Sequence, residues 1–410
     1  MPGIGEFFRE LGRRPGLAIS ASFLVVIFIG AGFLSLPQAT VARERIPFID
    51  ALFMSTSATC VTGLVVTDPE SISRYGQTVI LLLIQAGGLG IMTWAVLFSV
   101  ILRRRLGIAQ QAVVLESLGI EHPGILKKTL IFMLVFTFVV EAIGFLVILP
   151  HMLQKVGNTG DALFVSSFHA VSAFCNAGFS TFNDNLQGFR GSILITMTIT
   201  SLVILGGLGL PVSFNLWHGF ISLLQGRAGR KIALHTQLAL ITSAALIGLG
   251  FGLFYLFERD HSLKDLPIQE QILASYFHSV VPRTAGFSTI DIATISEPSF
   301  ILLMFLMFIG GSPGSTAGGI KTTTFAVLMA TLYAFCRGSD EVECFGRTIA
   351  KVVIQKALTI ALLGMLVVLV ACLILSSTER VPLEVVVFEV FSAFDTVGLS
   401  AGLTPGLSLT

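Results

Sequence analysis

The chain alternates long apolar runs with shorter segments that mix apolar, hydroxyl and small residues. The long runs lie at about 17–36, 77–102, 129–150, 192–224, 233–257, 299–335 and 352–376. Because about 20 helical residues cross the apolar core of a bilayer, these runs predict membrane-spanning helices. The shorter segments lie at about 49–66, 162–182, 271–291 and 384–404. They are too short and too polar to span, so the predicted order is long, short, long, repeated along the chain.

Composition supports a lipid environment. Of the 410 residues, 54% are hydrophobic and only 12% are charged, whereas soluble domains carry about 25% charged residues. The sequence therefore predicts an all-α integral membrane protein. The net charge of +1 gives no global field for a polyanionic partner, so we expect no nucleic acid to bind.

Basic residues predict the orientation in the membrane. They gather before the first run, between the second and third, and after the fourth and sixth: Arg9, Arg13, Arg14, Arg103, Arg104, Arg105, Lys127, Lys128, Arg227, Arg230, Lys231, Arg337, Arg347, Lys351 and Lys356. The connections that lead into the short segments carry fewer. By the positive-inside rule the amino terminus is cytoplasmic, and each short segment enters from the outer side.

The four short segments share one pattern. They are FMSTSATCVTGLVVTD (53–68), FHAVSAFCNAGFSTFND (168–184), YFHSVVPRTAGFSTID (276–291) and FEVFSAFDTVGLSAGLT (388–404). Each has an aromatic residue ten positions before a glycine and a large apolar residue after it. The glycines are Gly63, Gly178, Gly286 and Gly398, at intervals of 108 to 115 residues. This agreement identifies an internal repeat.

The repeat predicts a cation pore. Non-helical backbone at membrane depth is tolerated only where it is buried in protein or lines a wet cavity. Four short helices that end at glycine-containing strands around one axis would present a ring of carbonyl oxygens, which can replace the hydration shell of a cation. The carboxyl ends of these helices would add partial negative charge. The alternative is four outer loops with similar helix caps, but their low charge and the apolar and hydroxyl residues before each glycine favour the pore.

Two other classes of membrane protein fit less well. A membrane enzyme would need converging His, Asp or Ser side chains in the spans, whereas the polar residues here gather at the repeated glycines. A carrier with inverted repeats is also conceivable. These repeats, however, all start from the cytoplasmic side, which suits an axis along the membrane normal. We therefore expect no enzyme activity.

A glycine-rich segment, GGSPGSTAGGIKTTT (310–324), lies inside the sixth long run. Interior glycines cost about 1 kcal/mol each in a helix, and Pro313 removes a further hydrogen bond, so the helix should break here. The alternative is a motif that lets helices approach closely. A Walker phosphate loop is excluded, because Ile320 separates Gly319 from Lys321.

Two charged residues occupy the same position in neighbouring repeats. Arg283 and Asp395 both lie three residues before their glycines. Because single buried charges are costly in a membrane and usually pair, we expect an Arg283–Asp395 ion pair that braces the third and fourth strands; the alternative is that each reaches water or a carbonyl. Glu141 is expected to be paired inside the protein, and His169 and His278 to be packing residues rather than ligands.

In these motifs the chain resembles the Trk/Ktr/HKT superfamily of cation transporters, and most closely the bacterial membrane subunit of Ktr (KtrB type). The resemblance covers nearly the whole chain. It implies four M1–pore helix–M2 repeats around a pseudo-fourfold pore axis, with the last M2 absent from this chain. The units implied are repeat 1 (1–105), repeat 2 (106–226), repeat 3 (227–338, with a gate loop at 310–321) and repeat 4 (339–410, M1 and pore helix only).

The resemblance also implies the site residues. The ion-binding filter would be formed by the carbonyls of Val61, Thr62, Gly63, Asn176, Ala177, Gly178, Thr284, Ala285, Gly286, Thr396, Val397 and Gly398. An intramembrane gate loop below it would contain Gly310, Gly311, Ser312, Gly314, Ser315, Thr316, Gly318, Gly319 and Lys321. Plant members that favour sodium often have Ser at the first filter glycine. Gly63 therefore favours K⁺ as the transported ion, while coupling to sodium or protons stays open.

The implied partners are a second copy of the chain, membrane lipid and a cytosolic RCK-type nucleotide-binding regulatory subunit (KtrA type). Since the chain has no Rossmann-like segment, ATP, ADP or NAD would bind that subunit, and this chain would hold no cofactor. The subunit would dock on the basic connections around 103–128 and 227–231. The implied location is the bacterial cytoplasmic (inner) membrane.

Overall fold

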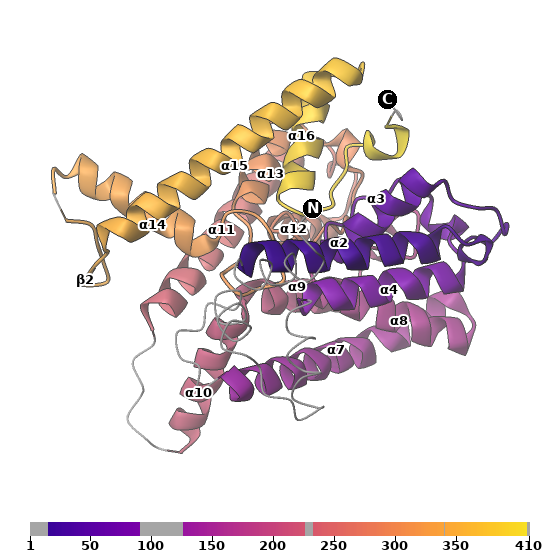
Figure 1. Cartoon of the computed structure of the whole chain (residues 1–410), viewed down its shortest axis with the longest axis horizontal. Coiled ribbons are helices and arrows are strands. Elements are labelled where there is room, and N and C mark those ends of the chain that lie inside the picture. The colour runs from indigo at the N-terminus through magenta and orange to yellow at the C-terminus, as the bar shows by residue number, and fades with distance from the viewer. Residues whose placement is uncertain (1–14, 91–125, 226–232, 340, 408–410) are drawn as a thin grey trace, which may run out of the picture.

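The computed structural model describes residues 15–90, 126–225, 233–339 and 341–407 (Figure 1). These parts are mostly helical, as predicted. The exception is a small antiparallel hairpin of β1 (Glu343–Cys344) and β2 (Arg347–Thr348). The basic residues before position 15 and the two expected docking connections, apart from residue 126 onward, lie outside the described residues.

The helices follow the predicted order of long and short elements. The first unit contains α2 (Pro15–Leu34), α3 (Phe48–Thr59) and α4 (Arg74–Gly88), and the second contains α7 (Leu126–Val156), α8 (Thr159–Phe174), α9 (Ile193–Leu208) and α10 (Leu210–Leu224). The third contains α11 (Leu234–Glu258), α12 (Ile268–Val280), α13 (Glu297–Phe308) and α14 (Thr322–Cys336). The fourth contains α15 (Lys351–Thr378) and α16 (Leu383–Phe394). The short helices α3, α8, α12 and α16 match the four predicted short segments.

Three described helices are long and apolar enough to cross a bilayer. They are Ile131–Val156 within α7, Leu234–Glu258 and Lys351–Thr378, and the bent pair α9 and α10 would make a fourth. Their apolar side chains remain exposed where a soluble protein would bury them. Leu362 on α15, for example, is 70% exposed, which fits a surface covered by lipid rather than water.

The run predicted at 192–224 is broken. Helix α9 ends at Leu208, and α10 leaves it at an angle of 101°. Gly209 makes the turn with a φ of +80°, a conformation that glycine adopts without a steric penalty. Pro211 then stands in the first turn of α10, where its missing N–H is harmless.

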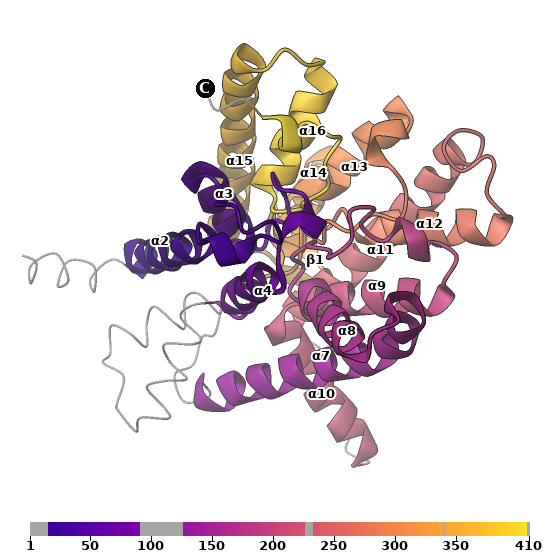
Figure 2. The ribbon, with the colours of Figure 1, turned by 90° about the vertical axis from the view of Figure 1, so that its right-hand side faces the viewer.

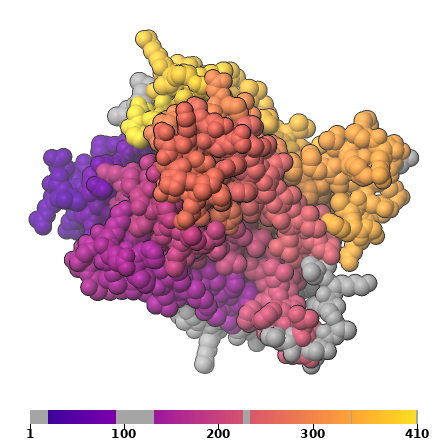
Figure 3. Space-filling view, turned by 180° about the vertical axis from the view of Figure 1, so that it is seen from behind, coloured from indigo at the N-terminus to yellow at the C-terminus, as the bar shows by residue number. Residues whose placement is uncertain are grey.

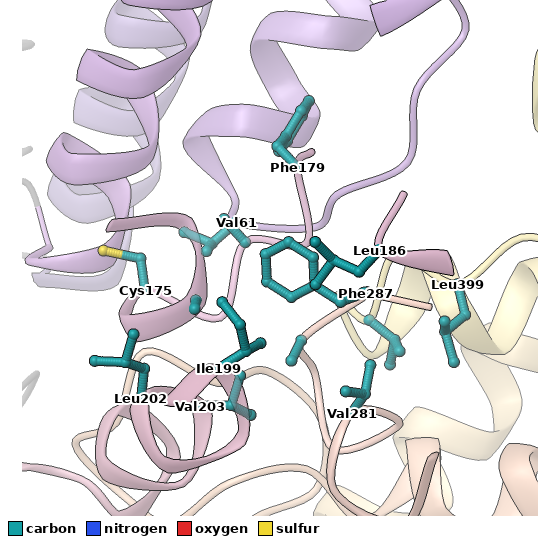
Figure 4. Packing of buried hydrophobic residues seen from close by; sticks show 14 of the residues in the cluster. Val61, Cys175, Phe179, Leu186, Ile199, Leu202, Val203, Val281, Phe287 and Leu399 are labelled. Atoms are coloured by element: carbon teal, nitrogen blue, oxygen red, sulfur yellow. The ribbon is translucent and has the colours of Figure 1, made fainter. Parts of the chain in front are cut away.

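The four units surround a common centre. Figure 2 shows the colours following one another around it, from indigo α2 to yellow α15. Neighbouring units meet through α4 with α8, α9 with α12, and α13 with α16. A single hydrophobic cluster joins all four units, including Val61, Phe179, Phe287 and Leu399 (Figure 4). Helix α14 and the hairpin instead project from one side of the molecule (Figures 1 and 3).

Candidate functional site

The four predicted filter segments share one unusual backbone conformation. The residue two positions before each glycine has a positive φ: Val61 (+59°), Asn176 (+58°), Thr284 (+73°) and Thr396 (+52°). The glycines follow with +93°, +68°, +65° and +90°. These four residues are the majority of the seven non-glycine residues with positive φ in the described parts of the chain.

This backbone is strained. A β-branched residue with positive φ is a genuine outlier, and such a conformation costs about 1–3 kcal/mol unless its surroundings hold it. Val61, Thr284 and Thr396 are all β-branched. Since strain of this kind concentrates at ligand sites, its appearance at the same position in four units indicates a shared functional backbone.

The four glycines form a closed ring. A Cβ built on Gly63, Gly178, Gly286 and Gly398 would lie 3.2, 2.8, 3.1 and 2.9 Å from the Cα of Gly178, Gly286, Gly398 and Gly63, respectively. Each glycine therefore faces the next one in chain order, and the last faces the first. The backbones approach so closely at the centre that no side chain fits.

Serine side chains hold three of the strands. Ser57 Oγ accepts a hydrogen bond from Gly63 N at 3.1 Å and donates to Leu64 O at 2.7 Å. Ser172 Oγ donates to Phe179 O at 2.8 Å, and Ser392 Oγ accepts from Gly398 N at 3.1 Å. Each serine lies six positions before its glycine, on the last turn of a short helix.

The third strand is wound differently. In the other three units, the residue before the glycine donates its N–H to the carbonyl five positions back, as Ala177 does to Ser172 at 2.7 Å. Ala285 instead donates to Val281, four positions back, at 2.9 Å. The short helix of the third unit also ends earlier, with five residues between Val280 and Gly286 against three in each of the other units, and His278 lies one position closer to its glycine than His169 does.

A hollow of about 450 Å³ opens on one face of the ring. Its walls include the four glycines and the residues that follow them, together with three carboxylates from different units, Asp68, Asp184 and Asp291. Each carboxylate also accepts a nearby backbone N–H, as Asp291 does from Ala293 at 3.0 Å. The hollow is acidic, which favours cations at this face.

The glycine-rich segment lies against the other face. The helix breaks as predicted, between α13 and α14, and Ile309 and Ile320 form an isolated bridge across the base of the loop. A Cβ on Gly318 would lie 2.7 Å from Asp395 O, and one on Gly319 would lie 3.2 Å from Asp395 Oδ1. Asp395 precedes its glycine, whereas the hollow is lined by residues at and after the glycines, so the loop and the hollow lie on opposite faces of the ring.

The loop also docks on the break between α9 and α10. Ser312 N donates to Gly207 O at 2.8 Å, Thr316 N donates to Gly206 O at 3.4 Å, and Leu210 N donates to Gly314 O at 3.0 Å. The last carbonyls of a helix lack intrahelical partners. The loop therefore satisfies the carbonyls that the end of α9 leaves free.

The predicted Arg283–Asp395 ion pair does not form. Arg283 donates instead to Ser243 Oγ at 3.1 Å and to Gly310 O at 3.0 Å, so its guanidinium turns toward its own unit and the start of the loop. The carboxylate of Asp395 is fully buried and has no hydrogen-bond partner in the described parts of the chain. The prediction was wrong because it placed equal sequence offsets at equal depths, although the third strand is wound differently.

Lys321 supplies the positive charge near Asp395. Its Nζ donates to Ala317 O at 2.6 Å, and Gly319, two residues before it, lies beside the Asp395 carboxylate. No salt bridge joins Lys321 and Asp395 in the described residues, so the two charges are more than 4 Å apart. Lys321 thus ties the end of the loop to its middle, on the side of the loop that faces Asp395 of the fourth strand.

Glu141 is paired inside the protein, as predicted. It is buried and accepts a hydrogen bond from Gln85 Nε2 at 3.2 Å, which ties α7 to α4 of the preceding unit. His169 and His278 are also buried among aromatic rings. Within the described residues, no group of three or more His, Cys, Asp and Glu side chains could hold a metal ion.

The sequence reasoning missed a second repeated motif. Gly-Gly pairs occur at 87–88, 206–207 and 310–311, each 24 to 28 residues after a filter glycine. A Cβ on Gly87 would collide with Thr59 O, and one on Gly206 with Phe174 O. The first two pairs let the second long helix pack against the end of the short helix, whereas Gly310 packs against Gly318 of its own loop. The regular spacing was the signal that could have found these pairs.

Comparison with known proteins agrees with this geometry. Residues 16–410 match the TrkH family model, described as a cation transport protein. The chain belongs to this family. It is 39% identical to the potassium/sodium uptake protein NtpJ of Enterococcus hirae and 38% identical to the Ktr system potassium uptake protein B of Bacillus subtilis. Each alignment covers 96% of this chain and 87% of the relative.

The fold resembles a solved structure of the family. The crystal structure of the potassium transporter TrkH from Vibrio parahaemolyticus superposes with a TM-score of 0.68 at 19% identity, covering 92% of this chain and 76% of that one. The family match and the two relatives confirm the resemblance to this superfamily of cation transporters. The chain is a multi-pass membrane transporter and not an enzyme.

Proposed function

We propose that the chain takes up K⁺ through a selectivity filter built from its four glycine-containing strands. The observation that carries the proposal is the closed ring of Gly63, Gly178, Gly286 and Gly398, with positive φ at the same two positions of every strand. A ring of main-chain carbonyls can replace the water that a cation sheds. The names of the relatives, a potassium/sodium uptake protein and a potassium uptake protein, support K⁺ as the cargo.

The loop at 310–321 is proposed as the gate of this pore. It lies across the face of the ring opposite the acidic hollow and contacts Asp395 and Thr396 of the fourth strand. It is held there mainly by backbone hydrogen bonds, one of them as long as 3.4 Å. Two side-chain hydrogen bonds, from Arg283 to Gly310 O and from Thr316 to Phe174 O, add to them. Local opening breaks only such contacts, so the proposed gate moves aside when they break.

We also propose that the chain is divided into four repeats and that its amino terminus is cytoplasmic. The proposed location is a bacterial cytoplasmic membrane. The working form would be a homodimer bound to a cytosolic nucleotide-binding subunit, as the family resemblance implies. The name of the B. subtilis relative, one protein of a Ktr system, supports a partner subunit. Flux coupled to sodium is a second candidate, favoured by the name of the E. hirae relative.

The test is cation flux in liposomes that contain the purified chain. We expect uptake of K⁺ and Rb⁺ to exceed that of Na⁺, and Gly63→Asp to abolish uptake, since the side chain would fill the ring. Uptake should be compared with and without Na⁺ in the bath to separate coupled from uncoupled flux. Equal uptake by the wild type and Gly63→Asp would refute a pore through the glycine ring.

A further inference from the structure

A second set of contacts holds the filter strands on the side that faces the hollow. The repeated pattern in the sequence does not include these contacts. In three units a buried polar side chain of the short helix reaches the serine that lies two positions after the glycine. The pairs are His169–Ser180, His278–Ser288 and Glu389–Ser400, with distances between the side-chain polar atoms of 3.2, 3.3 and 2.5 Å. The first unit has Met54 and Val65 at the corresponding positions.

The two histidines are fixed by their own helices. His169 Nδ1 lies 2.8 Å from Val165 O, and His278 Nδ1 lies 2.9 Å from Ala274 O. A carbonyl can only accept a hydrogen bond, so Nδ1 carries a proton in both rings. Nε2 is then directed at the serine, and each contact joins a helix to the strand just beyond its glycine.

Glu389 makes a larger set of contacts. Its Oε1 accepts hydrogen bonds from Ser400 Oγ at 2.5 Å, Ala401 N at 3.0 Å and Leu403 N at 3.2 Å. Its Oε2 accepts from Thr404 Oγ1 at 2.8 Å. The fourth strand therefore wraps around one carboxyl group after it leaves the ring.

These contacts fit an ionised carboxylate. Backbone N–H groups can only donate, and a carboxylate oxygen can only accept, so both oxygens of Glu389 are matched by donors. Glu389 is only 4% exposed, and no basic side chain in the described parts of the chain lies within 4 Å of it. Ser400, its nearest partner, lines the hollow. A negative charge thus lies one hydroxyl group behind the wall of the cation entrance.

We propose that Glu389 is a positioning residue for the fourth filter strand, and that its charge draws monovalent cations to the outer end of the filter. The proposal rests on the proposed cation pore. It assigns the charge to one unit, because the equivalent side chains are histidines in the second and third units and Met54 in the first.

The two roles can be separated with three variants. Glu389→Gln keeps the shape and the oxygen that accepts from Ser400, Ala401 and Leu403, but removes the charge. Glu384→Gln is the matched control, because it removes an exposed carboxylate from the same helix α16 without touching the strand. Glu389→Ala removes both the charge and the hydrogen bonds.

The measurement is the concentration dependence of Rb⁺ uptake into liposomes, together with the ratio of K⁺ to Na⁺ uptake. We expect Glu389→Gln to raise the apparent KM about fivefold at low ionic strength with little change in maximal rate, as loss of one nearby charge predicts. The effect should shrink in a bath of higher ionic strength, because salt screens it. Glu384→Gln should keep the KM within about twofold of the wild type, because its exposed charge is screened by salt, and Glu389→Ala should also lower the K⁺/Na⁺ ratio.

A wild-type KM for Glu389→Gln would overturn the role of the charge. A wild-type K⁺/Na⁺ ratio for Glu389→Ala would overturn the positioning role, and if that variant does not fold, the ratio is measured on Glu389→Leu paired with Ser400→Ala. Stabilisation of the detergent-solubilised chain by K⁺ gives a second readout, which Glu389→Gln should weaken. Absence of uptake by the wild-type chain would instead refute the proposed pore, so the two failures are distinguishable.

Discussion

On the outer face of the glycine ring, buried side chains hold the strands, whereas on the inner face a loop lies against them mainly through its backbone. The outer contacts include His169–Ser180 and the four hydrogen bonds accepted by Glu389. The inner contacts include Ser312 N to Gly207 O and Leu210 N to Gly314 O. Inner and outer here follow the orientation predicted from the basic residues.

The difference concerns which face can move. Satisfied hydrogen bonds between buried side chains rigidify a site, and on the outer face they link three of the four strands to the short helix of the same unit. On the inner face, the loop of the third unit depends on carbonyls at the end of α9 in the second unit and leaves the buried Asp395 carboxylate without a hydrogen bond. The arrangement suits a fixed filter above a movable gate.

The largest effect on uptake is expected from a substitution in the glycine ring, where both faces meet. In Gly286→Ala the new Cβ would lie 2.5 Å from Val397 O and 3.0 Å from Gly178 Cα, at a φ of +65°. Strain of about 1–3 kcal/mol should lower Rb⁺ uptake about tenfold or more, since 1.4 kcal/mol is a factor of ten. Gly32→Ala is the control, because nothing lies within 4 Å of its Cβ; equal uptake by both variants would contradict the tight ring.

The next effect concerns the attraction between the fourth strand and the loop. Asp395→Asn keeps the size of the side chain but removes its charge and hence its attraction to Lys321. If that attraction holds the gate closed, uptake should rise about fivefold to tenfold, within the range of coupling free energies between sites. Lys321→Gln should act in the same direction, and the double variant should add little. Fully additive effects would show that the two charges act independently.

A smaller effect on uptake is expected when one hydrogen bond between the second and third units is removed. Leu210→Pro removes the N–H that donates to Gly314 O at the first position of α10, where proline is tolerated. A lost hydrogen bond of about 0.5–1.5 kcal/mol should loosen the loop and raise uptake about threefold to fivefold. Leu210→Ala keeps the N–H and serves as the control; identical uptake by the two variants would mean that this contact does not hold the gate.

The smallest effect should come from giving the first unit the outer contact that it lacks. Met54→His alone would bury an unpartnered polar group and destabilise the chain, and Val65→Ser would restore a partner. We expect a favourable coupling of about 1 kcal/mol in a double-mutant cycle of thermal unfolding in detergent. A coupling of zero would show that the first unit does not share the outer geometry.

Much of this arrangement could be predicted from the sequence. The apolar runs gave the long helices, the regularly spaced glycines gave four related strands, and the glycine-rich segment at 310–321 gave the break after α13. These features depend on local composition and periodicity, which a single sequence displays directly. The resemblance to the Trk/Ktr/HKT superfamily was confirmed by the family match.

What could not be predicted depends on contacts between distant segments. The third strand is wound differently from the other three, with Ala285 N bonded to Val281 O, and Arg283 points away from Asp395; no pattern within that strand predicts this. The break at Gly209 within the run at 192–224 was not predicted, because the loop of the third unit that bonds to it comes from a distant part of the chain. The role of Glu389 was missed because its partners lie 11 to 15 residues further along the chain.

The most direct test of the central claim is to locate bound Rb⁺ by its anomalous scattering in crystals of the chain. Carbonyl coordination by the four strands predicts anomalous peaks on the axis that passes between Gly63, Gly178, Gly286 and Gly398, and their loss in Gly286→Ala crystals. Peaks away from that axis, with none between the four glycines, would contradict the account.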